Sequence, residues 1–230
     1  MSRYVIATTK SWNIENTKKL IKNNPQEEIF LITEKSELTK AFLDDYRPRY
    51  VFFPHWSWII PEEVYSNYQC VVFHMTDLPF GRGGSPLQNL LVRGIYKSKI
   101  SAIRVDSGVD TGPVYFKEPV DISEGNANQI FINISGIVFG KMIPKLMNET
   151  IVPVPQEGEV LSFKRRKPEQ SEIPEGLSQR QIYDYIRMLD GEGYPTAFKK
   201  YDNGRMFFYD AVFDDGIVTA KVRFMENETI

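Results

Sequence analysis

Cysteine and histidine are scarce in this chain, and their scarcity excludes several classes of protein. A single cysteine, Cys70, precludes an intrachain disulfide and fits a reducing compartment. Two histidines, with no H-x-x-x-H or C-x-x-C spacing, make a poor ligand set, so we predict no metal site. The first strand-to-helix turn lacks G-x-G-x-x-G and G-x-x-x-x-G-K-[ST], which disfavours a dinucleotide fold of the usual type and a P-loop.

The chain also lacks a dominant charge and a long apolar run. Its 28 Lys and Arg against 30 Asp and Glu argue against a dedicated nucleic-acid binder. One basic run, residues 164–167, is most simply a solvated loop, and whether it binds anything stays open. No apolar run approaches the ~20 residues needed to span a bilayer, and the N-terminus lacks the apolar region of a signal peptide. We therefore expect a cytoplasmic protein that makes no membrane contact.

Apolar strands alternate with helices through the first ninety residues. Strands and helices are predicted in turn at 4–8, 14–22, 28–33, 36–43, 50–53, from 61, and at 69–74. Near-continuous apolar strands joined by helices favour an α/β fold with a doubly wound, mostly parallel sheet.

The rest of the chain predicts three regions. Strands at 99–105 and 114–120 and a long amphipathic helix at 123–147 complete a first domain over 1–150. A linker follows at 151–176. Residues 177–230 form a small C-terminal region, with a helix at 178–189 and a β-hairpin turned at Asp214-Asp215-Gly216.

Residues 71–94 place a histidine where a predicted strand ends. His74 is followed by a glycine loop, and Ser85-Pro86 is typical of a helix N-cap and first turn. Ligands of open α/β sheets bind at the carboxyl ends of strands, and helix N-termini favour anions. The Asp106–Asp110 loop ends the next strand, so we expect it at the same edge of the sheet, where a carboxylate can orient His74. One interpretation is a His/Asp pair that moves a proton at this edge of the sheet, although the residues alone do not identify the reaction. The alternative is a structural histidine.

Two motifs at this spacing resemble the 10-formyltetrahydrofolate-dependent formyltransferases. They are His74-x-Thr76-x-Leu78-Pro79-x-x-Arg82-Gly83 and Asp106-x-Gly108-x-Asp110-Thr111-Gly112. The family's usual runs are N-x-H-x-S-L-L-P-x-x-R-G and D-x-G-x-D-x-G. The resemblance implies a Rossmann-like formyltransferase fold and an amine that attacks the formyl carbon of 10-formyltetrahydrofolate. By motif matching, His74 is the catalytic histidine that polarises the carbonyl and shuttles the proton. Asp110 is the aspartate that sets the ionisation of His74 and accepts the proton of the amine.

The resemblance also implies a folate site and exposes one departure. The residues expected around the folate are Trp58, Ile59, Ile60, Val105, Asp106 and Asp110. The family's asparagine two residues before the histidine is Val72 here, so an oxyanion donor is missing from its usual place. Such a donor is worth about 2.7–4 kcal/mol. Thr76 is the first candidate for a substitute, and Asn89 or Gln88 come next.

Within this family, two stretches resemble the sugar N-formyltransferases. They are the sequence around His74 and the run Tyr194-Pro195-Thr196-Ala197-Phe198. The nearest resemblance is to the branch that acts on a UDP-linked amino sugar in pseudaminic acid biosynthesis. We therefore expect a nucleotide-linked amino sugar as acceptor and no nucleic-acid partner. Its expected contacts are Thr9, Lys10, Trp12, Arg82, Gly83 and Gly84.

Several alternatives stay open. Three of the expected acceptor contacts have an alternative explanation that needs no substrate. Lys10 would be a surface residue of a turn, Trp12 would pack on a helix face, and Arg82 would brace a loop. The acceptor could instead be a carrier-bound aminoacyl group, as in formylation domains of nonribosomal peptide synthetases. The chain could also be a relative of the methionyl-tRNA or the glycinamide ribonucleotide formyltransferases. The chain's end at residue 230 and its acidic balance are taken to count against tRNA. Apolar positions in the tail hairpin could serve a homodimer.

Overall fold

The computed structural model describes residues 1–226, which fall into two compact units. The first unit is made of Met1–Arg82, Lys99–Val120 and Ile132–Ser162. The second is made of Gly83–Ser98, Asp121–Phe131 and the chain from Phe163 onward. Each unit is therefore assembled from three separate segments. The three-region division at residues 150 and 176 stays a prediction.

A six-stranded sheet with the order β2-β1-β3-β4-β6-β7 forms the centre of the first unit. Its strands are β1 (Arg3–Ala7), β2 (Glu28–Ile32), β3 (Tyr50–Phe53), β4 (Cys70–His74), β6 (Lys97–Arg104) and β7 (Val114–Asp121). β1 pairs in parallel with β2 and β3, and β3 pairs in parallel with β4, whereas β6 is antiparallel to β4. The predicted α/β fold with a mostly parallel sheet is confirmed.

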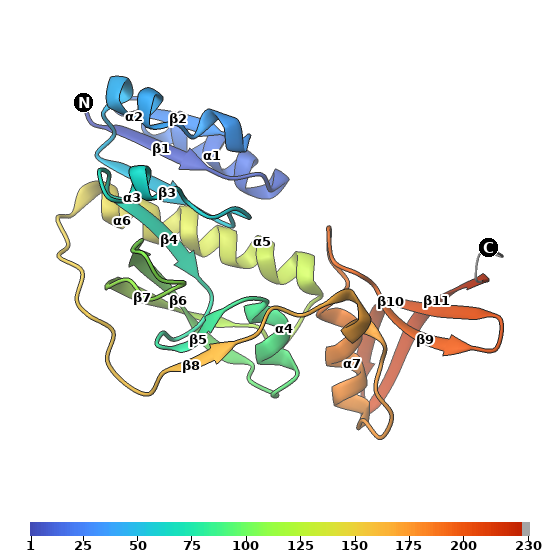
Figure 1. Ribbon diagram of the computed structural model, residues 1–230. Helices are drawn as coiled ribbons and strands as arrows, with labels where there is room; N and C mark the ends of the chain where they lie inside the picture. The colour runs from blue at the N-terminus through green and yellow to red at the C-terminus, as the bar shows by residue number, and fades with distance from the viewer. Residues whose placement is uncertain (227–230) are drawn as a thin grey trace. The chain divides into compact units, whose positions relative to one another are not determined.

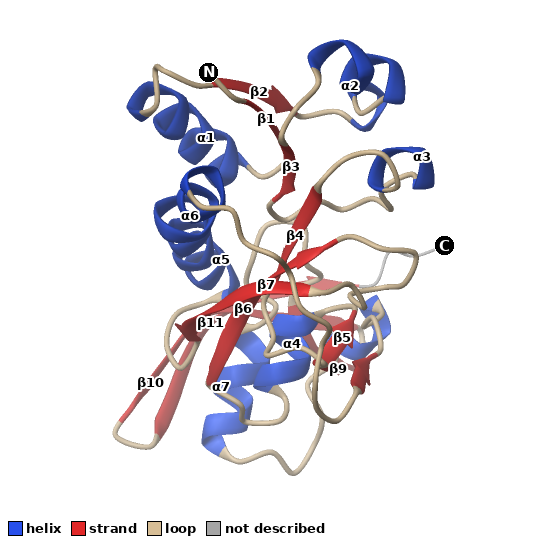
Figure 2. Cartoon of the chain, turned by 90° about the vertical axis from the view of Figure 1, so that its left-hand side faces the viewer, coloured by secondary structure: helices blue, strands red, loops and turns tan. Residues whose placement is uncertain are grey.

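Helices cover both faces of this sheet (Figures 1 and 2). On one side lie α1 (Ser11–Asn23), α5 (Ala127–Ile137) and α6 (Ile143–Asn148), and on the other lie α2 (Lys40–Tyr46) and α3 (Glu62–Tyr65). Strand alternation accounts for the two layers. Val5 of β1 joins an apolar cluster with Leu43 and Val64 of α2 and α3, while the neighbouring Tyr4 hydroxyl donates to the Met147 carbonyl of α6 at 3.3 Å.

Two helices differ from their predicted form. A 3₁₀ turn occupies Lys35–Glu37, and α2 is capped by Thr39, whose hydroxyl oxygen accepts from the Phe42 N–H at 3.2 Å. The single helix predicted over 123–147 begins at Ala127 and is interrupted by a π-helical turn, Val138–Met142. Pro144 explains the interruption, because proline has no N–H for a bond one turn back and its ring crowds that carbonyl.

The helical stretch Ala127–Asn148 also corrects an expectation about apolar runs. By length and composition alone, with a mean hydropathy of 1.4, it is long enough to cross a membrane. Half of its most apolar window is buried inside the protein, and a single helix of this kind is weak evidence for a membrane span.

The glycine loop after His74 is in fact a strand. Residues Phe80–Gly83 form β5, which pairs with β8 (Leu161–Phe163) in a two-stranded sheet. β8 belongs to the segment predicted as a linker, which is therefore a structured part of the protein.

The second unit combines two helices with a three-stranded sheet. Its elements are α4 (Pro86–Leu91), a 3₁₀ turn (Pro168–Ser171), α7 (Gln179–Arg187), β9 (Ala197–Tyr201), β10 (Gly204–Asp214) and β11 (Ile217–Glu226). The helix predicted from Ser178 is confirmed with a full capping box, since the Ser178 hydroxyl accepts from the Gln181 N–H and the Gln181 side chain accepts from the Ser178 N–H. The hairpin turn is confirmed by positive φ at Asp215 and Gly216. The homodimer stays a prediction.

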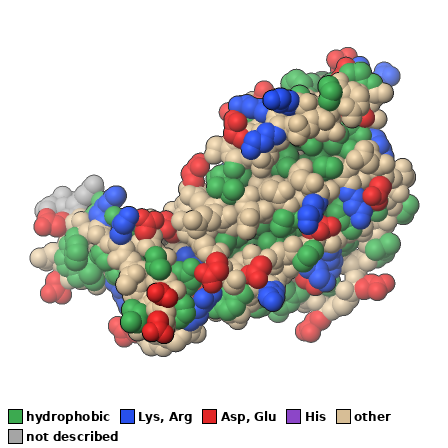
Figure 3. All heavy atoms as spheres, turned by 180° about the vertical axis from the view of Figure 1, so that it is seen from behind, with side chains coloured by type: hydrophobic (Ala, Val, Ile, Leu, Met, Phe, Trp, Pro, Cys, Tyr) green, Lys and Arg blue, Asp and Glu red, His purple; other side chains and the backbone are tan. Residues whose placement is uncertain are grey.

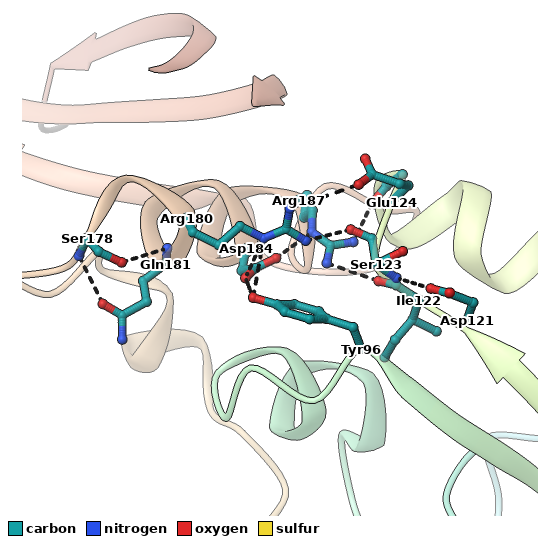
Figure 4. Close-up of polar contacts among 11 residues, drawn as sticks. Tyr96, Asp121, Ile122, Ser123, Glu124, Ser178, Arg180, Gln181, Asp184 and Arg187 are labelled. Atoms are coloured by element: carbon teal, nitrogen blue, oxygen red, sulfur yellow. Dashed lines mark hydrogen bonds and ion pairs between the residues drawn. The ribbon is translucent and has the colours of Figure 1, made fainter. Parts of the chain in front are cut away.

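An ion-pair network fixes α7 within this unit (Figure 4). The Asp184 carboxylate, only 4% exposed, accepts from Arg187 at 2.7 Å and from the Tyr96 hydroxyl at 2.6 Å. The Arg187 guanidinium also donates to the carbonyls of Ile122 and Gly125. Its charge is therefore paired and its donors are satisfied, as a buried arginine requires.

Surface charge is locally mixed. Figure 3 shows acidic, basic and apolar side chains interspersed over the face that it presents. The net charge of −2 thus says little about any single surface of the molecule.

Candidate active site

His74 ends β4 with both ring nitrogens facing oxygen atoms. Nε2 lies 2.7 Å from the Gly81 carbonyl oxygen, and Nδ1 lies 3.4 Å from Oδ2 of Asp110. The two side chains are 9% and 17% exposed. A carbonyl oxygen only accepts, so in this ring orientation Nε2 carries a proton. Nδ1 is then the nitrogen that can take up a further proton, beside a carboxylate that stabilises the resulting charge.

Asp110 reaches His74 by a different route from the one expected. Because β6 is antiparallel to β4, with Val71 opposite Arg104, the carboxyl end of β6 lies near the start of β4. The expectation that this strand ends at the same edge as His74 is wrong. The loop turns back sharply instead: Asp110 has a φ of 55°, and a Cβ on Gly112 would lie 1.7 Å from the Arg104 carbonyl oxygen. Only glycine allows this close passage.

Asp106, one of the expected folate contacts, holds this loop together. Its Oδ1 accepts from the Thr111 hydroxyl at 2.6 Å and from the Gly108 N–H at 3.1 Å. The neighbouring Val105 N–H donates to the Cys70 carbonyl at 2.9 Å. The loop that presents Asp110 is thus internally braced.

Apolar surface takes the place of the family asparagine. Val72 lies two residues before His74 on the same side of β4 and packs against Leu78 and Ile103. The hydroxyl of Thr76 is 3.3 Å from the Gly81 carbonyl, the same oxygen that His74 contacts. Thr76 therefore has an acceptor within the protein.

The other two candidates for a substitute donor belong to the second unit. The Asn89 amide donates to the carbonyls of Gly84, Ser85 and Lys164. The Gln88 amide donates to the Met188 carbonyl at 2.9 Å. Both amides are engaged in binding neighbouring backbone.

A cluster of Lys10, Trp12 and His55 lies beyond the ends of β1 and β3. Lys10 Nζ is 5.6 Å from the Trp12 ring centroid, and the Trp12 and His55 rings meet edge-on at 6.1 Å. Burial, with a smaller effect of the Lys10 charge, lowers the pKa of His55 to about 4, so its imidazole is neutral at pH 7. His55 was not expected in this cluster from the sequence, although a histidine just after a strand was a usable signal. Thr9 is half-buried beside this cluster in sequence.

The three expected acceptor contacts after His74 are held by protein contacts. Arg82 donates from Nε and Nη2 to Oε1 of Gln156 at 3.0 and 2.8 Å, which matches the loop brace left open above. Gly83 and Gly84 fall in the second unit, where an added Cβ would lie 2.5 Å from the Phe163 carbonyl oxygen and 2.6 Å from Cβ of Arg165. Close packing is sufficient to explain both glycines.

The loop after β3 contains a donor that has no acceptor. Trp56 Nε1 is buried and has no hydrogen-bond partner among the described residues. Trp56, Val72 and Val105 pack against one apolar cluster that includes Ile60. Trp58 and Ile59, in contrast, are 37% and 91% exposed. An apolar wall with an unsatisfied N–H suits a flat heterocycle that carries acceptors. Trp56 is not among the folate contacts expected from the sequence.

A solved structure matches this chain over nearly its whole length. Methionyl-tRNA formyltransferase from Clostridium thermocellum is 54% identical, with a TM-score of 0.95 over 99% of this chain and 100% of that one. The chain belongs to the formyltransferase family. Its formyltransferase motifs thus lie in the fold that they predicted.

Two further comparisons agree with this family. Residues 168–225 match the family described as methionyl-tRNA formyltransferase, C-terminal domain. Methionyl-tRNA formyltransferase from Clostridium botulinum is 30% identical over 173 residues, which are 73% of this chain and 55% of that protein. The chain spans about half the length of the curated relatives it matches.

These findings correct the predicted acceptor. A sugar N-formyltransferase from Shewanella shares the fold, with a TM-score of 0.68 over 100% of this chain and 99% of that one, but is only 13% identical. The relatives with substantial identity are named for methionyl-tRNA instead. The prediction of a UDP-linked amino sugar is therefore wrong, and so is the prediction of no nucleic-acid partner. Chain length misled because a protein that this chain covers from end to end carries the methionyl-tRNA name, and net charge misled because it does not report the charge of a local surface.

Proposed function

We propose that this protein is an N-formyltransferase that moves the formyl group of 10-formyltetrahydrofolate to the amino group of methionyl-tRNA, in the cytoplasm. The contact between His74 and Asp110, at 3.4 Å, carries the proposal of amine acylation. The 54% identity to a protein named methionyl-tRNA formyltransferase supports the acceptor.

His74 is assigned the proton transfer. 10-Formyltetrahydrofolate supplies the activated formyl carbon. An amine that attacks a carbonyl carbon must lose a proton, and His74 Nδ1 accepts it while Nε2 stays bonded to Gly81. The same proton then passes to the leaving nitrogen. One N–C bond forms, one breaks, and the imidazole returns to its starting state.

Asp110 is assigned the stabilisation of the charged imidazole. Its carboxylate attracts His74 only after proton uptake, so it favours the transition state over the ground state. Val72 offers no hydrogen bond to the formyl oxygen, and Thr76 is bonded to Gly81. His74 is therefore proposed to balance most of the negative charge that develops on that oxygen.

The folate is assigned to the loops after β3 and β6. Trp58, Ile59, Ile60, Val105, Asp106 and Asp110 are the proposed contacts. The unpartnered Nε1 of Trp56, in the same apolar cluster as Ile60, supports the fit because a bound heterocycle would give that donor an acceptor.

An exposed face of the second unit supports a nucleic-acid partner. By strand register, one face of the β9–β11 sheet carries Lys200, Arg205, Phe207, Tyr209, Lys221 and Arg223, together with Phe198, which is itself buried. Arg205 lies 4.8 Å from the Phe198 ring centroid, and Arg223 lies 5.8 Å from that of Tyr209. Cations interleaved with aromatic rings suit phosphates and bases, even though Lys200 and Lys221 also pair with carboxylates.

Transfer to charged tRNA tests this proposal. The full chain is incubated with 10-formyltetrahydrofolate and methionyl-tRNA, and formylmethionine is measured after alkaline deacylation. We expect formylmethionine from the parent protein and none from His74→Ala. No formylmethionine from the parent would sink the proposed acceptor. Transfer only to glycinamide ribonucleotide or to a carrier-bound aminoacyl thioester would retain the chemistry and replace tRNA.

A further inference from the structure

Gln156 lies in the segment that composition predicts to be a linker, yet its side chain is fully used in hydrogen bonds. Its Nε2 donates to the carbonyl oxygens of Asp110 and Gly112, both at 2.8 Å. Its Oε1 accepts from Nε and Nη2 of Arg82, at 3.0 and 2.8 Å. A primary amide has two N–H donors and two acceptor lone pairs, and all four are used here.

The partners also fix which way the amide points. Rotating it by half a turn would set the oxygen against the two carbonyls and the NH₂ group against the Arg82 guanidinium. Both contacts would then be repulsive. The amide therefore has one favourable orientation, with its donors on the loop that carries Asp110.

The backbone on either side of Gln156 is held in place. Two residues before it, Val154 exchanges two hydrogen bonds with Val114, at 2.7 and 2.9 Å. Five residues after it, the Leu161 N–H donates to the Pro79 carbonyl at 3.4 Å. Gln156 thus extends from a short segment whose backbone is hydrogen-bonded on both sides, rather than from a flexible linker.

We propose that Gln156 is the positioning residue that holds Asp110 against His74. Asp110 has a φ of 55°, in the left-handed region that non-glycine residues seldom adopt. The bonds from Gln156 to the carbonyls of Asp110 and Gly112 hold the backbone in that conformation, which aims the carboxylate at His74. This role rests on the proposed formyl transfer, because positioning matters only if the pair does chemistry.

Arg82 acts through the same amide. Its two N–H groups orient Oε1 of Gln156, so the arginine of the R-G motif is joined to the aspartate loop by one side chain. A contact of this kind restricts the loop without touching substrate. Displacing a reacting group by about 1 Å can cost about 100-fold in rate, so the orientation of one amide has a measurable effect.

Three variants test the role in the full-length chain. Gln156→Leu removes all four bonds, and Gln156→Glu keeps the acceptor for Arg82 but loses both donors to the loop. Gln69→Leu is the matched control, because it removes one side-chain bond, to the Tyr115 hydroxyl, at the other end of β4. Steady-state kinetics with methionyl-tRNA and hydrogen exchange of the 106–112 segment are measured for each.

Both Gln156 variants are expected to lower kcat by about 10–100-fold with little change in KM, and to speed exchange in residues 106–112. The Gln69 control should leave both measurements at parental values. A kcat within threefold of the parent, or unchanged exchange in the loop, overturns the proposal.

Failure of the proposed reaction can be told apart from failure of this inference. If the parent transfers no formyl group while both Gln156 variants speed loop exchange, the reaction is wrong and the hold on the loop is right. If the parent is active and the Gln156 variants match it, Gln156 has no positioning role.

Discussion

Asp110→Asn separates the charge of the carboxylate from its shape. Asparagine occupies almost the same volume and keeps an oxygen for His74, so the loop geometry is preserved. What is lost is the attraction between a carboxylate and the imidazolium that forms when Nδ1 takes a proton. At 3.4 Å and an effective dielectric constant of about 20, that attraction is about 5 kcal/mol.

This value is an upper limit for the effect on rate. Asp110 is 17% exposed, so water and salt reduce the interaction. Each 1.36 kcal/mol corresponds to about a factor of ten, which places the full 5 kcal/mol near 10³–10⁴ and the expected loss in kcat at about 10²–10³. KM should change little, because the attraction exists only after proton transfer begins.

The assay is formylmethionine production under steady-state conditions, with the melting temperature of each protein as a check on folding. A kcat within threefold of the parent in a well-folded Asp110→Asn variant would refute the assignment of Asp110. Asp77→Asn is the control, since Asp77 is a partly exposed carboxylate of the same unit that pairs with Lys99 and Lys117.

Three further outcomes are expected. Burial lowers the pKa of His55 from 6.5 to about 4, so below pH 6.5 the unfolded chain binds a proton that the folded chain does not. The free energy of unfolding should therefore fall by on the order of 3 kcal/mol as the pH is lowered from 6.5 to 4. His55→Asn, which suits a φ of 54°, should flatten that part of the profile in urea titrations, and an unchanged slope would contradict the burial argument. Asp184→Leu leaves Arg187 buried without its charge partner and should cost about 3–5 kcal/mol in urea unfolding, a loss that a parental midpoint would disprove. Trp56→Phe removes the unpartnered indole N–H and should weaken binding of a tetrahydrofolate analogue about tenfold in fluorescence titrations. Equal affinity of the variant and the parent would contradict the proposal that this loop binds the folate.

Local patterns predicted the elements well. Strand 50–53 and the helix after Ser178 follow from apolar periodicity and a capping box, which act over a few residues. The turn at residues 214–216 follows from the tolerance of Asp and Gly for positive φ. The expectation that Asp110 lies close to His74 is also met, at 3.4 Å, while the catalytic role of the pair stays a prediction.

Long-range pairing was not encoded in the same way. The sequence shows that β6 exists but not that it runs antiparallel to β4, because strand direction depends on how the preceding connection crosses the sheet. The conclusion that Asp110 would lie near His74 was therefore right for a wrong reason. The strand β5 was missed because its residues, Phe80–Gly83, are turn-rich and become a strand only through pairing with β8.

His74 and its motif were determined by the sequence, which places a histidine at the end of an apolar strand next to a glycine-rich segment. Tertiary structure alone decided what surrounds it. Gln156 contacts Asp110 and Gly112 across 46 and 44 positions of the chain, and Arg82 across 74. No local pattern can signal such a side chain, because an amide with four hydrogen bonds and a solvated amide in a linker look the same until the chain folds.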